Sequence, residues 1–379
     1  MLRIAWKNLL HDKLKLATAV LGVVFATFLM TVQVGMLLGF VQTITGIMAH
    51  SPGDLWVVPA NTPNFEMVLG QPDRRHYQAQ AVPGVAWSSR LIVDFTIWKT
   101  PSGQMEQVIL VGIDPERPVG LPWAMEAGDL DGIWDRHGVV VDGLERERLG
   151  GASPLELGQE VEILFHRARV VGFSRGVRSF TTTPFVFTSL KFARDYAWGM
   201  RPDDQVKYVV IGVAPGHDVE QVRGELLARF DDAEVLTRDE FMTRSVVYWL
   251  LGTGAGLMSI LAAVLGLLVG GAIVGQSIYS QTMEKFREYG TFKALGGTNG
   301  ELAGIILGQA LITSWIGYAA GVAASRAFAQ AFGQGKVLID LPGGVLVVLG
   351  AVTALMCVAA SLTSVARVVR LEPYSVFKA

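Results

Sequence analysis

Four long apolar segments dominate the hydrophobic pattern of this 379-residue chain. Residues 16–49 contain no Lys, Arg, Asp or Glu, and further uncharged apolar segments run over residues 245–279, 302–325 and 341–366. A helix needs about 20 predominantly apolar residues to cross a bilayer. The pattern therefore predicts four membrane-spanning helices, and the first two segments are longer than one bilayer thickness.

Residues 48–243 separate the first apolar segment from the second, and their pattern is that of a folded polar domain. Val219–Phe230 places its apolar residues on one helical face. Short runs rich in β-branched and aromatic residues predict strands, and they cover residues 54–58, 90–98, 106–112, 138–141, 160–165, 169–173, 184–188 and 208–213. We therefore expect an α-helical integral membrane protein with a large extracytoplasmic α+β domain, of two subdomains, inserted between its first and second transmembrane helices.

Basic residues set the expected orientation. They gather in residues 3–15, residues 285–293 and the C-terminal tail, and cytoplasmic loops carry the excess of Lys and Arg. Both termini are therefore expected in the cytoplasm. The predicted order is an amphipathic interfacial helix (1–15), a long first span (16–47), a periplasmic domain (48–243), a long second span (245–280), a cytoplasmic helix (281–300), a third span (302–325), a short extracytoplasmic loop (326–340), a fourth span (341–366) and a cytoplasmic tail (367–379).

Composition and charge exclude several classes of function. The chain is 51% hydrophobic and 17% charged, which is too apolar for an ordinary soluble protein. Residues 48–243 hold 19 Lys and Arg against 28 Asp and Glu, so the domain lacks the basic surplus that nucleic-acid binding requires. The single cysteine, Cys357, rules out an internal disulfide.

Motifs that carry catalysis are missing from the sequence. There is no GxxxxGK[ST] phosphate loop, no HExxH, no paired CxxC and no GxSxG, and the six His share no ligand spacing. We therefore expect no enzyme, no metal site and no cofactor bound by this chain. A membrane-bound enzyme with its site in residues 48–243 is the least supported alternative, because no catalytic motif points to it.

Small residues recur at the spacing that lets membrane helices approach closely. Pairs with GxxxG spacing include Gly266 with Gly270, Gly271 with Gly275, and Gly317 with Gly321. They predict helix packing, either within the chain or between two copies, and the motif does not distinguish the two.

A charged island, residues 281–299, lies between the second and third apolar segments. Gly296 and Gly297 are expected to end its helix, and Gly290 would permit close backbone approach. A charged rim is expected at Glu284, Lys285, Arg287 and Glu288, and apolar knobs at Tyr289, Phe292 and Leu295. The residues alone leave open whether this helix couples to a partner or is a polar connector.

Several segments resemble the FtsX-like and MacB-like permeases of ABC transporters, which work by mechanotransmission (type VII). Residues 287–296 of the island are similar to that family's signature, with departures at Tyr289, Thr291 and Phe292. The N-terminal Ala5-Trp-Lys-Asn-Leu9, residues 219–241 and the ending at residues 366–373 also resemble the family. The resemblance implies an ATPase-coupling role for Glu284, Lys285, Arg287, Glu288, Tyr289, Gly290, Phe292, Lys293, Leu295 and Gly296.

Within this family the chain is most similar to the DevC-type branch, through residues 51–58, 74–77 and 98–100. That branch implies a permease of the bacterial inner membrane that pairs with a second copy of itself and with two copies of an ABC ATP-binding subunit, which would hold ATP-Mg. It also implies a membrane-fusion (HlyD-like) adaptor, an outer-membrane duct, contact with membrane lipids, and export of a lipid-like or amphipathic substrate. The alternative within the family is a signalling or scaffold permease that activates an extracytoplasmic partner such as a cell-wall hydrolase.

Overall fold

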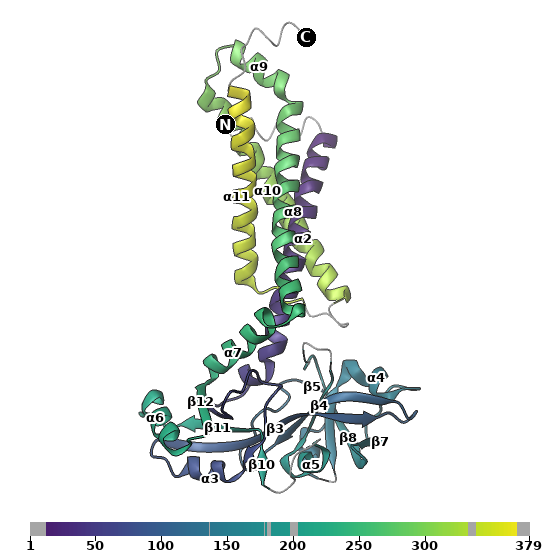
Figure 1. The fold of residues 1–379 in the computed structure, drawn as a ribbon. Coiled ribbons are helices and arrows are strands. Elements are labelled where there is room, and N and C mark those ends of the chain that lie inside the picture. The colour runs from purple at the N-terminus through teal and green to yellow at the C-terminus, as the bar shows by residue number, and fades with distance from the viewer. Residues whose placement is uncertain are drawn as a thin grey trace. The chain divides into compact units, whose positions relative to one another are not determined.

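The computed structural model describes residues 13–135, 137–177, 179, 183–197, 204–332 and 339–369. These residues divide into two compact units, a helical unit (residues 1–39 and 258–379) and a domain unit (residues 40–257) (Figure 1). Most of the predicted interfacial helix, residues 1–12, lies outside the described residues, as do residues 333–338 of the predicted loop and residues 370–379 of the predicted tail.

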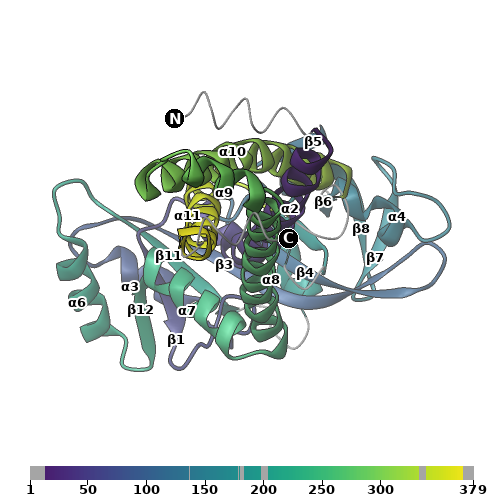
Figure 2. The ribbon, with the colours of Figure 1, turned by 90° about the horizontal axis from the view of Figure 1, so that it is seen from above.

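Four helices are long and apolar enough to cross a membrane. They are α2 (Lys13–Ala49), α8 (Gly254–Glu284), α10 (Asn299–Phe332) and α11 (Gly343–Val369). In Figures 1 and 2 α10 crosses the other three obliquely. With the α+β domain between the first and second of them, these helices confirm the predicted fold class.

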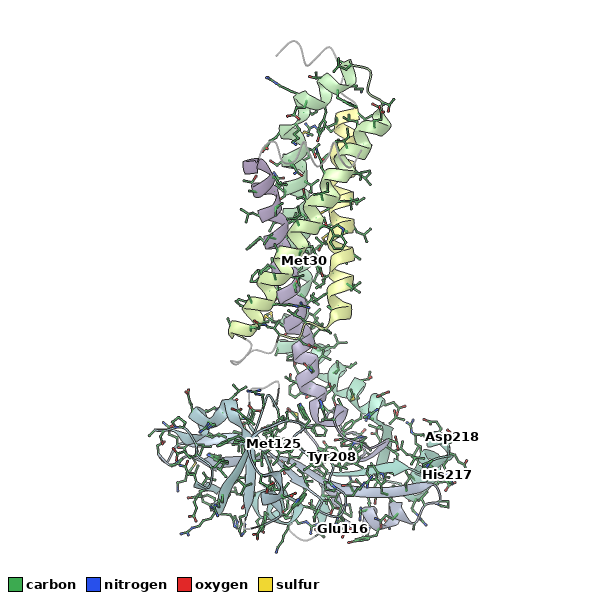
Figure 3. The ribbon with its side chains drawn as sticks, turned by 180° about the vertical axis from the view of Figure 1, so that it is seen from behind. Met30, Glu116, Met125, Tyr208, His217 and Asp218 are labelled. Carbon is green, nitrogen blue, oxygen red and sulfur yellow. The ribbon has the colours of Figure 1, made fainter. Side chains whose placement is uncertain are left out.

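Glycines bring the helices of the helical unit together around α2. A Cβ added at Gly270 would lie 2.7 Å from Met30 Cγ, and one added at Gly317 would lie 2.6 Å from Val23 Cβ. Met30 is buried among the helices, as Figure 3 shows. The pairs Gly266–Gly270 and Gly317–Gly321 therefore hold α8 and α10 against α2 within one chain, with Gln33, Met30, Val23 and Thr27 as the residues they meet.

The remaining glycine pair behaves differently. A Cβ added at Gly271 would lie 3.4 Å from Met356 Cε of α11, whereas one added at Gly275 would meet open space. Gly275 therefore makes no close helix contact among the residues that the structure describes.

The predicted second span, 245–280, is interrupted. α7 (Arg238–Leu251) ends before Gly252, and α8 begins at Gly254. Thr253 Oγ1 donates to the Trp249 carbonyl and accepts from the Gly256 amide, so it satisfies backbone groups at the break. Glycine weakens helix interiors, and the Gly252-Thr-Gly254 sequence therefore separates two helices where continuous hydrophobicity predicted one.

One mixed sheet organises the domain unit, in the order β12-β1-β11-β3-β4-β9-β6-β8-β5, with β7 pairing to β3 and β8. The long β3 joins the two halves that the sequence suggested as subdomains, so they share one sheet. The strands are β1 (Leu55–Pro59), β2 (Gln71–Pro72), β3 (Val85–Lys99), β4 (Met105–Ile113), β5 (Met125–Gly128), β6 (Gly138–Asp142), β7 (Glu160–Ile163), β8 (His166–Ser174), β9 (Phe185–Ser189), β10 (Gln205–Val206), β11 (Tyr208–Val213) and β12 (Ala233–Thr237). β2 and β10 form a separate pair.

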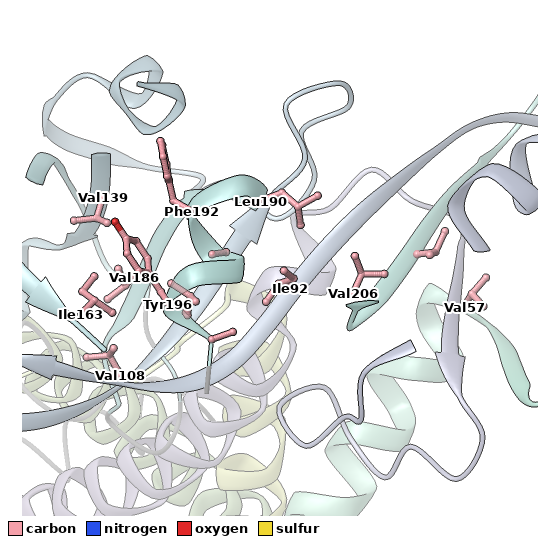
Figure 4. Close-up of a cluster of buried hydrophobic side chains, with 14 of the residues drawn as sticks. Val57, Ile92, Val108, Val139, Ile163, Val186, Leu190, Phe192, Tyr196 and Val206 are labelled. Carbon is pink, nitrogen blue, oxygen red and sulfur yellow. The ribbon is translucent and has the colours of Figure 1, made fainter. Parts of the chain in front are cut away.

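Short helices cover the first face of this sheet. They are α3 (Arg74–Gln80), α5 (Leu190–Tyr196) and α6 (Val219–Arg229), and Figure 4 shows α5 residues among the strand residues of this core. The domain also contains α4 (Arg146–Gly150) and the 3₁₀ turns η1 (Leu130–Trp134) and η2 (Gly143–Glu145). Because both faces are covered, the central strands are continuous apolar runs rather than alternating ones.

The second face of the sheet buries the ends of the two helices that lead to the membrane spans. Ile47 and Met48 from α2, and Phe241 from α7, lie in one apolar core with Trp56 and Tyr208 of the sheet. Tyr208 lies inside the domain in Figure 3, where Glu116, His217 and Asp218 lie at its surface. Both helices are thus built into the folded domain.

Candidate functional site

The charged island forms a short helix, α9 (Phe286–Ala294), between α8 and α10. α8 continues to Glu284, so the predicted single helix over 281–300 is wrong at both ends: Lys285 is a non-helical joint and α10 already begins at Asn299. Thr298 caps α10 through a reciprocal pair of bonds with Glu301, the Thr298 Oγ1 accepting from the Glu301 amide at 3.2 Å and the Glu301 carboxylate accepting from the Thr298 amide at 3.0 Å.

The end of α9 is set by glycine. Gly296 has φ of +94°, a left-handed conformation that favours glycine. Its amide donates to the Lys293 carbonyl and the Gly297 amide donates to the Phe292 carbonyl, which is the Schellman pattern of helix termination. The prediction that Gly296 and Gly297 end this helix agrees with this geometry.

The inner face of α9 is fixed to α10. Tyr289 is 3% exposed, and its hydroxyl donates to Gln309 Oε1 of α10 at 2.7 Å. Burial, with a smaller contribution from the Glu288 carboxylate, raises the pKa of the Tyr289 hydroxyl above its ordinary value, so the group stays protonated and able to donate. Leu302, Ile305, Ile306 and Val368 complete the apolar cluster around the ring.

A second attachment joins α9 to α11. Lys293 Nζ donates to the Val369 carbonyl at 2.7 Å, at the last residue of α11. Helix C-termini leave carbonyls without intrahelical partners and carry a partial negative charge, so an ammonium stabilises this end. α9 is therefore held by two helices of its own chain.

The outer face of α9 is exposed. Its exposed residues follow a spacing of three or four, which places them on one side of the helix, and they are Arg287, Glu288, Thr291 and Ala294. Glu284, the last residue of α8, and Leu295, which follows α9, are exposed as well and flank this stripe. The Leu295 side chain is 84% exposed. This stripe offers a partner acidic and basic groups beside one apolar side chain.

The structure divides the predicted site residues between these two faces. Glu284, Arg287, Glu288 and Leu295 lie outside as expected, but Tyr289 and Phe292 pack inward and are not apolar knobs. Lys285 is 6% exposed and does not belong to the charged rim. Gly290 is buried on the inner face and Lys293 is half-buried. Tyr289, Phe292 and Lys293 of this set contact α10 or α11 of the same chain.

Sequence reasoning missed the uncharged polar residues of the spans. Gln309 and Thr313 lie one turn apart on α10 and are buried, and Gln281 Nε2 of α8 lies 3.4 Å from Thr313 Oγ1. A half-open cavity of about 210 Å³ lies between α2 and α8 and is lined by Thr18, Ala19, Gln276, Ser277, Ser280, Gln281 and Glu284. The available signal was the repeat of Gln, Ser and Thr in apolar segments, which a search for charged residues alone overlooks.

One buried and one half-buried carboxyl in the domain unit, Glu66 and Asp94, were also missed. Burial raises the pKa of Glu66 from 4.5 to about 7, although a bond from Ser179 Oγ at 2.8 Å opposes the rise. Burial also raises the pKa of Asp94, against the opposing effect of the Lys207 ammonium 3.2 Å away. Across the residues that the structure describes, no group of three or more His, Cys, Asp and Glu is arranged to hold a metal ion.

Comparison with known proteins gives matches to both units. A family model described as the MacB-like periplasmic core domain matches residues 16–229, which is more than half of the chain. A second, described as the FtsX-like permease C-terminal, matches residues 242–373. Uncharacterized ABC transporter permeases from two strains of Mycobacterium tuberculosis, CDC 1551 / Oshkosh and ATCC 25618 / H37Rv, are each 26% identical over 223 residues, which cover 58% of this chain and 58% of the relative's length.

Solved structures share a loose likeness in the domain. The extracellular domain of the noncanonic ABC-type transporter YknZ from Gram-positive bacteria gives a TM-score of 0.36 at 14% identity, over 48% of this chain and 98% of that one. The periplasmic region of MacB from Actinobacillus actinomycetemcomitans gives a TM-score of 0.38 at 10% identity, over 50% of this chain and 90% of that one.

The family assignment rests on the two sequence models, which follow one another along the chain with the four long helices in the expected places. The protein is thus a multi-pass membrane protein, and its chain belongs to the family of the MacB-like periplasmic core domain, joined to an FtsX-like permease C-terminal region.

Proposed function

We propose that this chain is the permease subunit of an ABC exporter, and that α9 docks on a separate ATP-binding subunit. The observation that carries the proposal is the division of α9 into a fixed inner face and an exposed outer face. Tyr289 and Lys293 attach the inner face to α10 and α11, while Glu288 and Leu295 are exposed on the outer face. A partner that pushes on α9 would therefore push on the helices behind it.

The chemistry of the outer stripe suits a protein partner. Glu284, Arg287 and Glu288 supply both signs of charge, which can fix the register of docking and reject wrong partners. Leu295, beside them, is 84% exposed, and burying its apolar side chain on docking would be favourable. We propose that ATP binds, with magnesium, on the partner.

The domain unit supports the second half of the mechanism, in which ATP hydrolysis moves the extracytoplasmic domain. Ile47 and Met48 of α2 share a core with Phe241 of α7, together with Trp56 and Tyr208 of the sheet. Protein interiors are close-packed and transmit displacement. A shift of either helix would therefore have to move or repack the sheet, as mechanotransmission requires.

We extend the proposal to the assembly that the DevC-type resemblance implies. Two copies of this permease, with both termini and α9 in the cytoplasm, would work with two ATP-binding subunits in the bacterial inner membrane. A membrane-fusion adaptor would meet the domain and lead a lipid-like substrate to an outer-membrane duct. Of the segments behind this resemblance, Tyr77 is 57% exposed and could meet an adaptor, whereas Trp98 is fully buried and has a structural role.

The test of coupling is a double charge change on the outer stripe. Glu288→Lys with Leu295→Glu should abolish co-purification of the ATP-binding subunit from native membranes, while the inner face of α9 is untouched. Glu160→Lys, at an exposed carboxylate in β7 of the domain, is the matched control and should retain the subunit. If the double variant binds the subunit as well as the control does, the coupling assignment is wrong.

Native mass spectrometry of the same purified complex tests the export assignment. An adaptor and a retained lipid-like molecule would support export. Capture of a cell-wall hydrolase with no adaptor would instead support the signalling role.

A further inference from the structure

The segment between β1 and β2, residues 61–70, runs along α7 toward the membrane span that follows. Arg244 Nη1 donates to the Thr62 carbonyl at 3.3 Å, the Phe65 amide donates to Ser245 Oγ at 3.1 Å, and Tyr248 Oη lies 3.7 Å from the sulfur of Met67. Later residues of the segment thus meet later residues of α7. At 1.5 Å per residue, Tyr248 lies only about 5 Å before the end of α7 at Leu251.

The far end of this segment exposes apolar side chains. Met67 is 47% exposed and Leu69 is 77% exposed, whereas Val68 between them is buried in the apolar core. On α7, Val247 and Leu251 lie one turn apart and are 48% and 60% exposed. Val247 and Leu251 neighbour Tyr248 on α7, which contacts Met67, and exposed apolar side chains that gather on one surface mark a contact site.

The charged groups that contact this region are paired. Lys207 is 8% exposed, donates from Nζ to the Val68 carbonyl at 3.0 Å and pairs with Asp94, and Arg244 pairs with Glu234. Residues 67–72 and 245–253 contain no Asp, Glu, Lys or Arg. Glu66, the only charged residue of the segment, is 8% exposed and its carboxylate accepts from Ser179. A charged group at this position would have kept the surface in water.

The position of the region along the chain places it at the edge of the bilayer. Gly254, the first residue of a helix able to cross a membrane, follows Leu251 by three residues. Tyr248 and Trp249 form an edge-to-face pair with ring centroids 5.3 Å apart. Tyr and Trp concentrate at membrane–water interfaces, and Met67 contacts Tyr248 of this pair.

We propose that Met67 and Leu69, with Val247 and Leu251, insert into the headgroup and acyl boundary of the leaflet from which α8 enters the bilayer. The occupant of this surface is the lipid bilayer itself. The segment gives the domain a membrane contact in addition to its two helices, as amphipathic surface elements do. This inference rests on the position of α7 and is independent of any ATP-binding partner.

The test places a reporter on the segment in the full-length protein. With Cys357→Ser as background, Leu69→Cys is labelled with an NBD fluorophore in nanodiscs that contain doxyl-labelled phosphatidylcholine. Phe165→Cys is the matched control, because Phe165 lies at the tip of the β7–β8 turn and is 79% exposed, close to the exposure of Leu69. We expect the Leu69 label to emit at shorter wavelength and to be quenched several-fold more by the doxyl lipid.

Two outcomes would overturn the inference. Equal quenching of the two labels would mean that the segment stays in water. A blue-shifted but unquenched label at Leu69 would mean that protein covers the surface, for example a second copy of this chain.

Discussion

Glu66 allows a quantitative test of how burial controls the stability of the domain. Its carboxyl is 8% exposed and accepts one bond, from Ser179 Oγ, while Oε2 has no partner in the described part of the chain. Burial raises its pKa from 4.5 to about 7. Replacement by Gln removes the charge but keeps a carbonyl oxygen that can accept from Ser179.

The sign of the effect follows from linkage. A carboxyl whose pKa is raised on folding binds its proton more tightly in the native state than in the unfolded state. Its favourable contribution to the free energy of unfolding is therefore complete below pH 4.5 and is lost as the pH rises to about 7. The loss is about 3 kcal/mol, at 1.36 kcal/mol for each pKa unit. Glu66→Gln should therefore match the wild type near pH 4 and be more stable by about 3 kcal/mol above pH 7.

Thermal unfolding of the full chain in nanodiscs, followed by tryptophan fluorescence across this pH range, measures the difference. The Trp56 ring lies 6.1 Å from Phe65, beside Glu66 in sequence, and so reports on this region. Glu160→Gln, at an exposed position, is the control and should leave the pH profile unchanged. A Glu66→Gln protein that gains no stability above pH 7, or gains as much at pH 4, would refute the reasoning.

Four further substitutions test the helical unit by thermal unfolding in nanodiscs. Tyr289→Phe leaves Gln309 without its hydroxyl donor and should destabilise the protein by about 1–3 kcal/mol; an unchanged melting temperature would mean that this bond contributes nothing. Gly296→Ala places a Cβ at φ of +94° and should cost about 1–2 kcal/mol, so a neutral effect would contradict the turn geometry. Gly270→Val should strain the contact with α2 by about 1–3 kcal/mol, whereas Gly275→Val, in open space, should be tolerated; similar effects of the two would argue against the packing described.

The fold was predictable from the sequence wherever the pattern of apolar and charged residues alone determines the element. Uncharged apolar runs identified four long helices, because a helix satisfies its own backbone hydrogen bonds within a membrane. Local chemistry also located the end of α9, since the Gly296-Gly297 pair can adopt the termination geometry that other residues resist. The break between α7 and α8 was missed because Gly252-Thr-Gly254 lies within an apolar run, and hydropathy is insensitive to backbone propensity.

The site was predicted as a segment but not as a surface. Tyr289, Phe292 and Leu295 all carry large apolar surface, and only the packing of α10 and α11 behind α9 decides that the first two face inward. Lys293 shows the same limit, because its bond to the Val369 carbonyl joins positions 76 residues apart. Non-local contacts of this kind leave no local pattern in a sequence.

The proposed transmission requires rigid attachment where force enters and where it leaves. On the input side, α9 is joined to α10 by a buried hydrogen bond and to α11 by a charged one, so it cannot slide without disturbing either helix. On the output side, α2 and α7 end in the same apolar core, so their relative motion must deform that core. Between α7 and α8 the helix is broken at Gly252-Thr-Gly254, and glycine is a common cause of such breaks. Force through the second membrane helix would therefore bend the chain at this point, whereas α2 is one helix from Lys13 to Ala49. In this mechanism α2 carries the displacement, and α7 acts as the hinged support against which the domain turns.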